Sequence, residues 1–164
     1  MPSTGTVGTI VTVAGNGFNA TEDIYIQFGT ILSITTGTST GSGSFSTTFT
    51  VDSQPWGTTT IIVTCINSGE RATSTFTIIP NILVSPVIGT VGSLVTVVGS
   101  GFDASTGIRI AFGTTQTNTQ CTTNRDGTFS YEYYLKDQLG NTRVTFNEFS
   151  EGVPQVMQEE QYYP

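Results

Sequence analysis

The sequence predicts an all-β protein made of two small β-sandwich domains. Three observations carry this prediction: the composition, an internal duplication, and apolar residues that alternate with polar ones. The 164-residue chain is rich in Thr and Gly and poor in Leu and Ala, so helix formers are depleted and β-branched strand formers are enriched. Short alternating segments separated by Gly, Asn and Pro turns are typical of β-sandwiches.

The duplication has a constant offset of 84 residues. Residues 5–18 match residues 89–102 with only conservative differences. Two further segments keep the offset: 24–30 with 108–114, and 43–46 with 127–130. Identity fades toward the end of the second copy. We therefore expect a first domain over residues 1–80, a short apolar linker that is the first strand of the second domain over 81–85, and a second domain over 86–164.

Within the first copy, each expected strand has its own apolar signal. Val11 and Val13 flank Thr12, and the next segment alternates from Ile24 to Phe28. A Gln-Pro-Trp-Gly turn follows the third segment. The expected strands in chain order lie within residues 7–13, 24–28, 45–51, 61–63 and 73–79. The alternation places Ile, Val and Phe inside and Thr outside.

Together these residues carry a family resemblance. Both copies have a proline followed by Gly-Thr-Val-Gly, Val-Thr-Val and Gly-x-Gly-Phe, then a strand ending in Phe-Gly and a Gly-x-Phe hairpin, and Thr-Phe-Thr-Ile-Ile-Pro closes the first copy. The pattern resembles the IPT/TIG family of immunoglobulin-like domains, especially the tandem copies in bacterial and archaeal cell-surface proteins. The resemblance is strong over residues 2–80 and 86–135 and weak over 136–164. It implies two tandem immunoglobulin-like sandwiches at the cell surface, as spacers, adhesin stalks, surface-layer parts or enzyme accessories.

The composition argues against several classes of function. The chain has no His, the usual general base and the commonest metal ligand. Its net charge of -7 disfavours nucleic acid and anionic membranes as partners. No apolar run approaches the roughly 18 residues that span a bilayer. We expect no enzyme activity, no cofactor, no nucleic-acid partner and no membrane insertion of this segment.

The proline positions indicate a difference between the copies. Pro2 matches Pro86, and Pro164 matches Pro80, yet the first copy has no counterpart of residues 81–85. In the related family this segment is the first strand, so the first domain should lack an edge strand that the second has. Two explanations stay open. The chain is a piece cut from a longer array, or it is a natural subunit whose open edge accepts a neighbour's strand, with residues 154–163 as the candidate donor.

Two catalytic-type motifs occur without the context that their chemistry needs. Residues 15–20 and 99–104 both fit the dinucleotide fingerprint, but alternating strand patterns follow instead of a helix. We expect a bulged turn there, with Phe18 and Phe102 closing the end of each sandwich. Residues 37–41 fit the nucleophile elbow, which needs a His that the chain lacks.

Calcium is the one cofactor for which the sequence contains candidate ligands. Residues 124–127 resemble part of a calcium loop, but a hairpin turn is the favoured interpretation. Asp103, Glu22 and Asp23 form a weaker candidate cation site at the domain junction.

The two cysteines are not repeat equivalents. Cys65 continues an apolar alternation and is expected to be buried, whereas Cys121 lies in a polar strand and is expected to be exposed. An interdomain disulfide, a reduced pair and an intermolecular link through Cys121 stay open. Asn19 begins an N-glycosylation sequon in a predicted surface turn.

We expect a non-enzymatic, extracellular structural module of a microbial surface protein: a stalk, surface-layer or filament subunit that assembles end to end by β-strand complementation. Its partners would be copies of itself or neighbouring immunoglobulin-like repeats. The alternative is an adhesin or accessory module that binds a surface glycan or protein through loops and tyrosines of the second domain. The candidate assembly or binding residues are Ile82, Leu83, Val84, Tyr131, Tyr133, Val156, Tyr162 and Tyr163.

Overall fold

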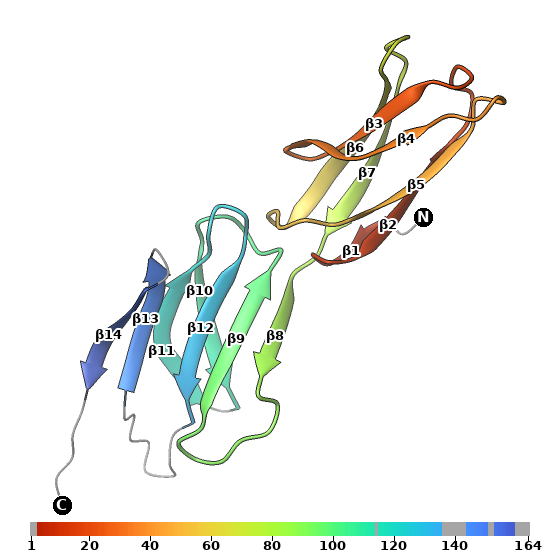
Figure 1. Cartoon of the computed structure of the whole chain (residues 1–164). Coiled ribbons are helices and arrows are strands. Elements are labelled where there is room, and N and C mark those ends of the chain that lie inside the picture. The colour runs from red at the N-terminus through yellow and green to blue at the C-terminus, as the bar shows by residue number, and fades with distance from the viewer. Residues whose placement is uncertain (1–2, 114, 136–143, 151–152, 160–164) are drawn as a thin grey trace, which may run out of the picture.

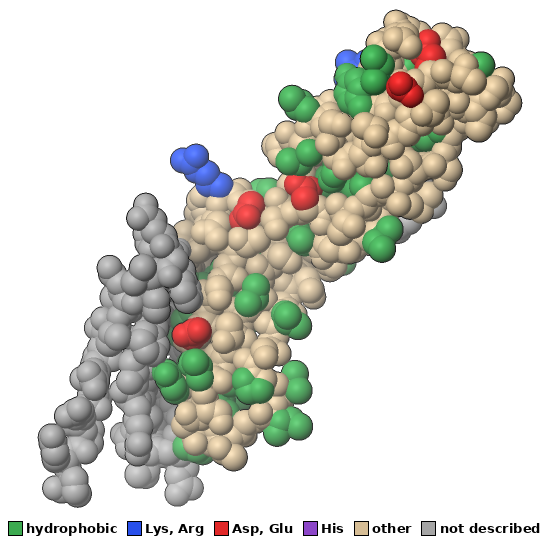
Figure 2. All heavy atoms as spheres, in the orientation of Figure 1, with side chains coloured by type: hydrophobic (Ala, Val, Ile, Leu, Met, Phe, Trp, Pro, Cys, Tyr) green, Lys and Arg blue, Asp and Glu red, His purple; other side chains and the backbone are tan. Residues whose placement is uncertain are grey.

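The computed structural model in Figure 1 is all-β, and the prediction of fold class is confirmed. It describes residues 3–113, 115–135, 144–150 and 153–159. These residues contain no helix, so none among them is long and apolar enough to cross a membrane. The strands form two groups that follow one another end to end (Figure 1). On the face that Figure 2 shows, acidic and basic side chains are few and scattered over the described surface.

The first domain is a sandwich of two sheets. One sheet has five strands in the order β1-β7-β6-β3-β4, and the other pairs β2 with β5. β1 runs parallel to β7, and the other pairs are antiparallel. The bounds are β1 Thr4–Gly5, β2 Ile10–Gly15, β3 Asp23–Phe28, β4 Ile31–Thr38, β5 Phe45–Thr50, β6 Gly57–Cys65 and β7 Arg71–Ile78.

The core of this domain follows the predicted alternation. Val11 and Val13 of β2 are buried, while Ile10, the first residue of this strand, is 68% exposed. Phe28 is fully buried, and its ring lies 4.9 Å from that of Phe49 across the two sheets. β4 was not among the predicted strands, because it is a sheet edge with no buried residue and hence no period-two signal.

The second domain has equivalents of β2 to β7 in the same order along the chain, preceded by the additional strand β8. Its described sheets are β12-β9-β8, β10-β11 and β13-β14, and every pair is antiparallel. The bounds are β8 Asn81–Ser85, β9 Leu94–Ser100, β10 Gly107–Phe112, β11 Thr115–Thr122, β12 Phe129–Tyr134, β13 Val144–Ser150 and β14 Val153–Glu159.

The register of the strand pairs repeats with the same 84-residue offset as the sequence. The agreement extends to the first two pairs of the β13–β14 hairpin, after which its register shifts by one residue relative to β6–β7. Three equivalent pairs illustrate it: Ile10↔Thr50 with Leu94↔Tyr134, Asp23↔Thr38 with Gly107↔Thr122, and Thr60↔Thr75 with Val144↔Glu159.

The described ladders of one sheet differ between the two domains. In the first domain β3 pairs with both β4 and β6, whereas the described ladders β10–β11 and β13–β14 are separate.

Candidate functional site: an open sheet edge and the joint between domains

The two equivalent strands β2 and β9 differ in what lies beside them. β9 is central, with β12 on one side and β8 on the other. β2 pairs with β5, and no strand of the described residues pairs with its other edge. β2 therefore presents free backbone N–H and C=O groups along one side, which are a template for a further strand.

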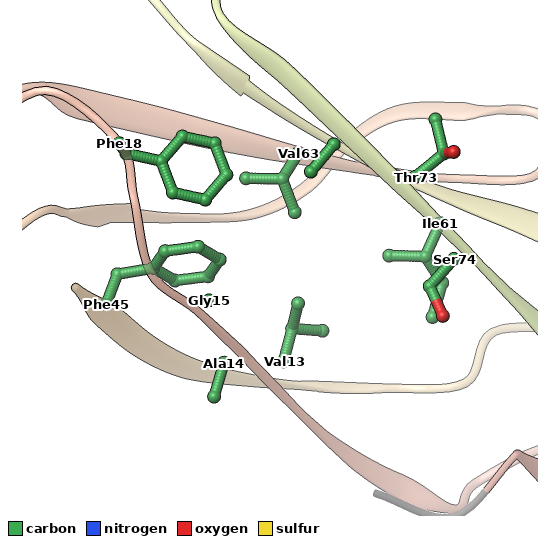
Figure 3. Close-up of a pocket in the computed structure, with 10 residues that line it drawn as sticks. Val13, Ala14, Gly15, Phe18, Phe45, Ile61, Val63, Thr73 and Ser74 are labelled. Carbon is green, nitrogen blue, oxygen red and sulfur yellow. The ribbon is translucent and has the colours of Figure 1, made fainter. Parts of the chain in front are cut away.

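An apolar groove lies between the two sheets of the first domain. It has a volume of about 150 Å³. Val13 and Phe45 come from the β2–β5 sheet, Val63 from β6 forms part of the opposite wall, and Ser74 from β7 lines the rim. Figure 3 shows the ring of Phe18 beside that of Phe45 at one end of the groove. The groove therefore combines an apolar lining with the free edge of β2.

The phenylalanines after the glycine turns close the sandwich ends, as predicted. The ring centroids of Phe18 and Phe45 are 5.3 Å apart at an edge-to-face angle of 70°. Those of Phe102 and Phe129 are 5.2 Å apart at 68°. β3 and β10 follow these turns, so neither glycine motif opens a helix that could bind a nucleotide phosphate.

The serine of the elbow-like motif is a structural residue. Ser39 is buried; its Oγ donates to the carbonyl of Asn19 at 2.6 Å and accepts the N–H of Glu22 at 2.9 Å. Sequence reasoning missed this role. The available signal was the hydroxyl residue at the equivalent position of the second copy.

That equivalent is Thr123, which makes the same two bonds. Its Oγ1 donates to the carbonyl of Asp103 and accepts the N–H of Thr106 at 2.9 Å. The hydroxyl therefore ties the turn after the glycine motif to the neighbouring strand in both domains.

A joint connects the two domains directly. The loop before β6 contains Pro55 and Trp56, and the Trp56 N–H donates to the carbonyl of Phe102 at 3.0 Å. A Cβ added at Gly127 would lie 2.9 Å from the Cα of Pro55. One added at Gly101 would lie 2.9 Å from the carbonyl oxygen of Ile79. Two glycines of the second domain thus allow the first domain to approach closely.

The proposed cation site at the junction is wrong. Glu22 lies at the far tip of the first domain, where its carboxylate accepts the hydroxyl of Ser68 at 2.6 Å, and this hydrogen bond lowers the pKa of Glu22. Asp103 lies beside Phe102 at the joint. Ser68, the partner of Glu22, lies in the turn after β6, whereas Trp56, which contacts Phe102, lies directly before β6. The length of β6 therefore separates the carboxylates of Glu22 and Asp103. The described residues contain no cluster of three or more His, Cys, Asp or Glu side chains that could hold a metal ion.

Residues 124–127 form the predicted hairpin turn. The Asn124 N–H donates to the carbonyl of Thr128 at 2.8 Å, and the Gly127 N–H donates to the carbonyl of Asn124 at 3.1 Å. The Asp126 carboxylate accepts the Thr128 hydroxyl at 2.7 Å. The side chain of Asp126 is therefore used within the turn.

Neither cysteine forms a disulfide and both are buried, so the structure contradicts a disulfide between them. The expected exposure of Cys121 is wrong, because only 4% of it is accessible and it packs in the core of the second domain. Cys121 pairs with Ile108 and points inward although its strand is polar in sequence. Cys65 is buried as predicted, and burial raises the pKa of its thiol.

The tyrosines do not form an exposed patch among the described residues. Tyr131 is buried, and Tyr133 is half-buried with its ring 6.2 Å from that of Phe112. The candidate binding residues Tyr162 and Tyr163 lie outside the described residues.

The remaining candidates lie on strands. Ile82 and Leu83 of β8 are exposed, and Val84 packs against the core of the second domain. Val156 pairs with Phe146 in the β13–β14 hairpin. The described part of the candidate donor segment therefore already has one strand partner.

Comparison with protein families covers the first domain. The IPT/TIG domain family model matches residues 1–78, which end at the last residue of β7. Residues 79–164 lie outside this match. Searches of curated proteins and of solved structures gave no significant match. Residues 1–78 of this chain are therefore an IPT/TIG domain, an immunoglobulin-like module of a family common in extracellular and cell-surface proteins, and a further β region follows it.

Proposed function

We propose that this chain is a non-enzymatic structural module of a microbial cell-surface protein, acting outside the cell as part of a stalk, surface layer or filament. In this proposal the open edge of the first domain accepts a β-strand from a copy of the chain or from a neighbouring immunoglobulin-like repeat. The IPT/TIG assignment of residues 1–78 supports the surface location, because such domains often occur in cell-surface proteins.

The observation that carries the proposal is the contrast between β2 and β9. An apolar groove lies beside the free edge of β2, while the equivalent β9 has β8 paired along it. A strand added to β2 would pair the free N–H and C=O groups and cover the groove at once. Main-chain hydrogen bonds then supply affinity, and side chains that enter the groove supply specificity.

The joint supports a mechanical role. The linker between β7 and β8 is short, contains Pro80 and no Gly, and leads directly into a five-residue strand. The hydrogen bond from Trp56 to Phe102 adds a second connection beside the covalent one. Two connections resist bending better than a single flexible linker, so the joint favours an extended pair of domains.

The alternative role, a glycan- or protein-binding adhesin module, has less support. A stacking platform for sugars needs exposed aromatic faces. Tyr131 is in the core, and Tyr133 is half-buried against it.

Peptide binding tests the proposed strand acceptance. A fluorescent peptide with the sequence of residues 80–86 is titrated with the full chain, and anisotropy is recorded. We expect saturable binding, and we expect the same peptide with Val84→Asp not to bind, because a charged side chain would enter the apolar groove.

A chain with Asn-Ile-Leu-Val-Ser in place of Met1 is the matched control, since its own added strand should fill the edge and prevent binding. Equal binding by both chains, or no binding to the original chain while circular dichroism shows it folded, would contradict the proposal.

A further inference from the structure

We infer that the far end of the first domain is a second, unoccupied copy of the joint surface, built to receive the loop and linker strand of another immunoglobulin-like repeat in a fixed register. The joint surface is defined here by Gly101, Phe102 and Gly127 of the second domain. This inference rests on the proposed function and adds the identity, direction and register of the strand.

The occupied joint uses backbone groups. The carbonyl of Phe102 accepts the N–H of Trp56 from the first domain, and the linker carbonyl of Ile79 lies against Gly101. Gly101 is buried by this contact. Because these contacts are made by backbone atoms and glycines, any repeat with the same turn geometry can form them.

The first domain reproduces this surface at its own far end. Gly17 and Gly43 have φ angles of 82° and 73°, and their equivalents Gly101 and Gly127 have 69° and 73°. The Phe18 N–H donates to the carbonyl of Gly43 at 3.1 Å, and the equivalent bond in the second domain is 3.0 Å. In both copies a Cβ at the hairpin glycine would collide with the phenylalanine carbonyl. The backbone of the joint surface is therefore present twice.

The copy in the first domain is uncovered. A Cβ added at Gly17 would meet nothing within 4 Å, and Gly17 is exposed where Gly101 is buried. The Phe18 carbonyl has no donor among the described residues, whereas its equivalent accepts Trp56. These are the groups that the occupied joint would cover.

The end of the first domain that carries Gly17 and Phe18 adjoins the apolar groove between its two sheets. Gly15 and Phe18 belong to the groove lining, and Figure 3 shows the two phenylalanine rings at one end of it. A linker that crosses Gly17 would thus continue directly along the free edge of β2. The joint surface and the groove form one continuous site for a loop and a strand.

The natural linker predicts the register of the incoming strand. On β9, Ile82 lies opposite Gly99, Leu83 opposite Val98 and Val84 opposite Val97, with the strands antiparallel. At the 84-residue offset the corresponding positions on β2 are Gly15, Ala14 and Val13. Val84 packs against the core of the second domain, so its counterpart would enter the groove beside Val13.

The occupant is therefore the end of a third repeat: an immunoglobulin-like domain whose Pro-Trp type loop reaches the Phe18 carbonyl, and whose closing proline is followed by an apolar strand without Gly. A joint of this kind is head-to-tail. Each added repeat exposes the same surface again, and the assembly extends without closing.

Cysteine cross-linking in a three-domain chain tests the register. Residues 2–85 are placed ahead of Pro2 of the full chain, so that the added linker precedes the original first domain. Leu83→Cys in the added linker is combined with Ala14→Cys in the domain that follows. Directly opposed residues have Cα atoms about 4.5–5.5 Å apart, which suits a disulfide.

Two controls frame the result. Leu83→Cys with Val98→Cys in the natural joint shows the yield of a correctly opposed pair. Thr12→Cys replaces Ala14→Cys as the mismatched pair, because a two-residue shift separates the Cα atoms by about 7–8 Å. We expect the Ala14 pair to oxidise as completely as the natural-joint control, and the Thr12 pair to stay reduced. Amide exchange should show the N–H of Trp56 protected in both copies of the domain.

The outcomes separate the two proposals. Oxidation of the Thr12 pair, or of neither pair, while the peptide of residues 80–86 still binds the original chain, overturns the inferred joint and leaves strand acceptance standing. The same result without peptide binding overturns both. Strand addition by residues 153–159 of a second copy would appear as intermolecular cross-links of Ala14→Cys chains carrying Val156→Cys, and would also overturn the inferred occupant.

Discussion

The two domains share the register of the β2–β5 and β9–β12 ladders but differ in what lies along the outer edge of β2 and of β9. The first domain has a core cluster of thirteen buried residues and a sheet edge with no partner strand in the described residues. In the second domain β8 pairs along the equivalent strand β9. The first domain thus has a filled core although no described strand pairs along the outer edge of β2.

The first domain can keep its core without the edge strand because its inward residues pack across the sandwich. Phe28 of β3 lies against Phe49 of β5, and Phe76 of β7 lies 6.0 Å from Phe28. None of these contacts involves the free side of β2. Water can satisfy the unpaired backbone groups of an exposed edge, so the open edge costs little stability and remains available for a partner.

The largest expected effect comes from the core of the first domain. Phe76→Ala removes a fully buried ring and should lower the free energy of unfolding of the first domain by about 3–5 kcal/mol. Denaturant unfolding with calorimetry measures it, and Thr75→Ala on the exposed face is the control. An equal loss of unfolding free energy in the second domain would show that the two domains do not unfold separately. Their stabilities could then not be compared domain by domain.

The next largest effect should come from weakening the packing of β8 on the second domain. Val84→Asp places a charge where β8 packs on the core, so we expect a loss of about 2 kcal/mol from the second domain alone. Leu83→Asp is the matched control, because Leu83 is 67% exposed and its replacement should change stability by under about 0.5 kcal/mol. Equal losses of stability from both substitutions would mean that the packing of Val84 on the core does not stabilise the second domain.

A smaller effect should be the same in both domains. Ser39→Ala and Thr123→Val each leave a carbonyl and an N–H without their hydroxyl partner, so each should cost its own domain about 1–2 kcal/mol. Separate unfolding transitions report the two losses. A loss confined to one domain would show that the equivalent hydroxyls do not have equivalent roles.

The smallest effect concerns alkaline pH. Burial raises the pKa of Cys65 above its ordinary value of 9.0, so the folded state favours the neutral thiol. This contribution to stability is complete below the ordinary pKa and is lost as pH rises through the folded value. The first domain should therefore weaken above about pH 9, and Cys65→Ala should remove that part of the pH dependence. A pH profile unchanged by Cys65→Ala would contradict this account.

The sequence predicted the elements that depend on side-chain periodicity. Alternation located β2, β3 and β7, and the glycine turns correctly placed Phe18 and Phe102 at the sandwich ends. β4 was missed because an edge strand buries no regular face. Cys121 was misplaced because its polar neighbours in the sequence concealed an inward-facing position.

The site was only partly predictable. Matching prolines between the copies led us to expect an open edge on the first domain, but the joint depends on the N–H of Trp56 and the carbonyl of Phe102. Every residue except proline has both of these backbone groups, so no sequence pattern identifies the N–H and the carbonyl that meet. The cation site was wrongly predicted for a similar reason. The sequence does not show that Glu22 and Asp103 lie near opposite ends of β6.

Calorimetry of a self-complemented chain is the most direct test of the open edge. Asn-Ile-Leu-Val-Ser replaces Met1, so that the sequence of β8 precedes Pro2 as it precedes Pro86. We predict that the unfolding temperature of the first domain rises by about 4–8 °C, equivalent to roughly 1 kcal/mol, while that of the second domain is unchanged. The same extension with Asp in place of its Val should give no rise. An unchanged first transition with the apolar extension would contradict the claim that β2 offers an open strand site.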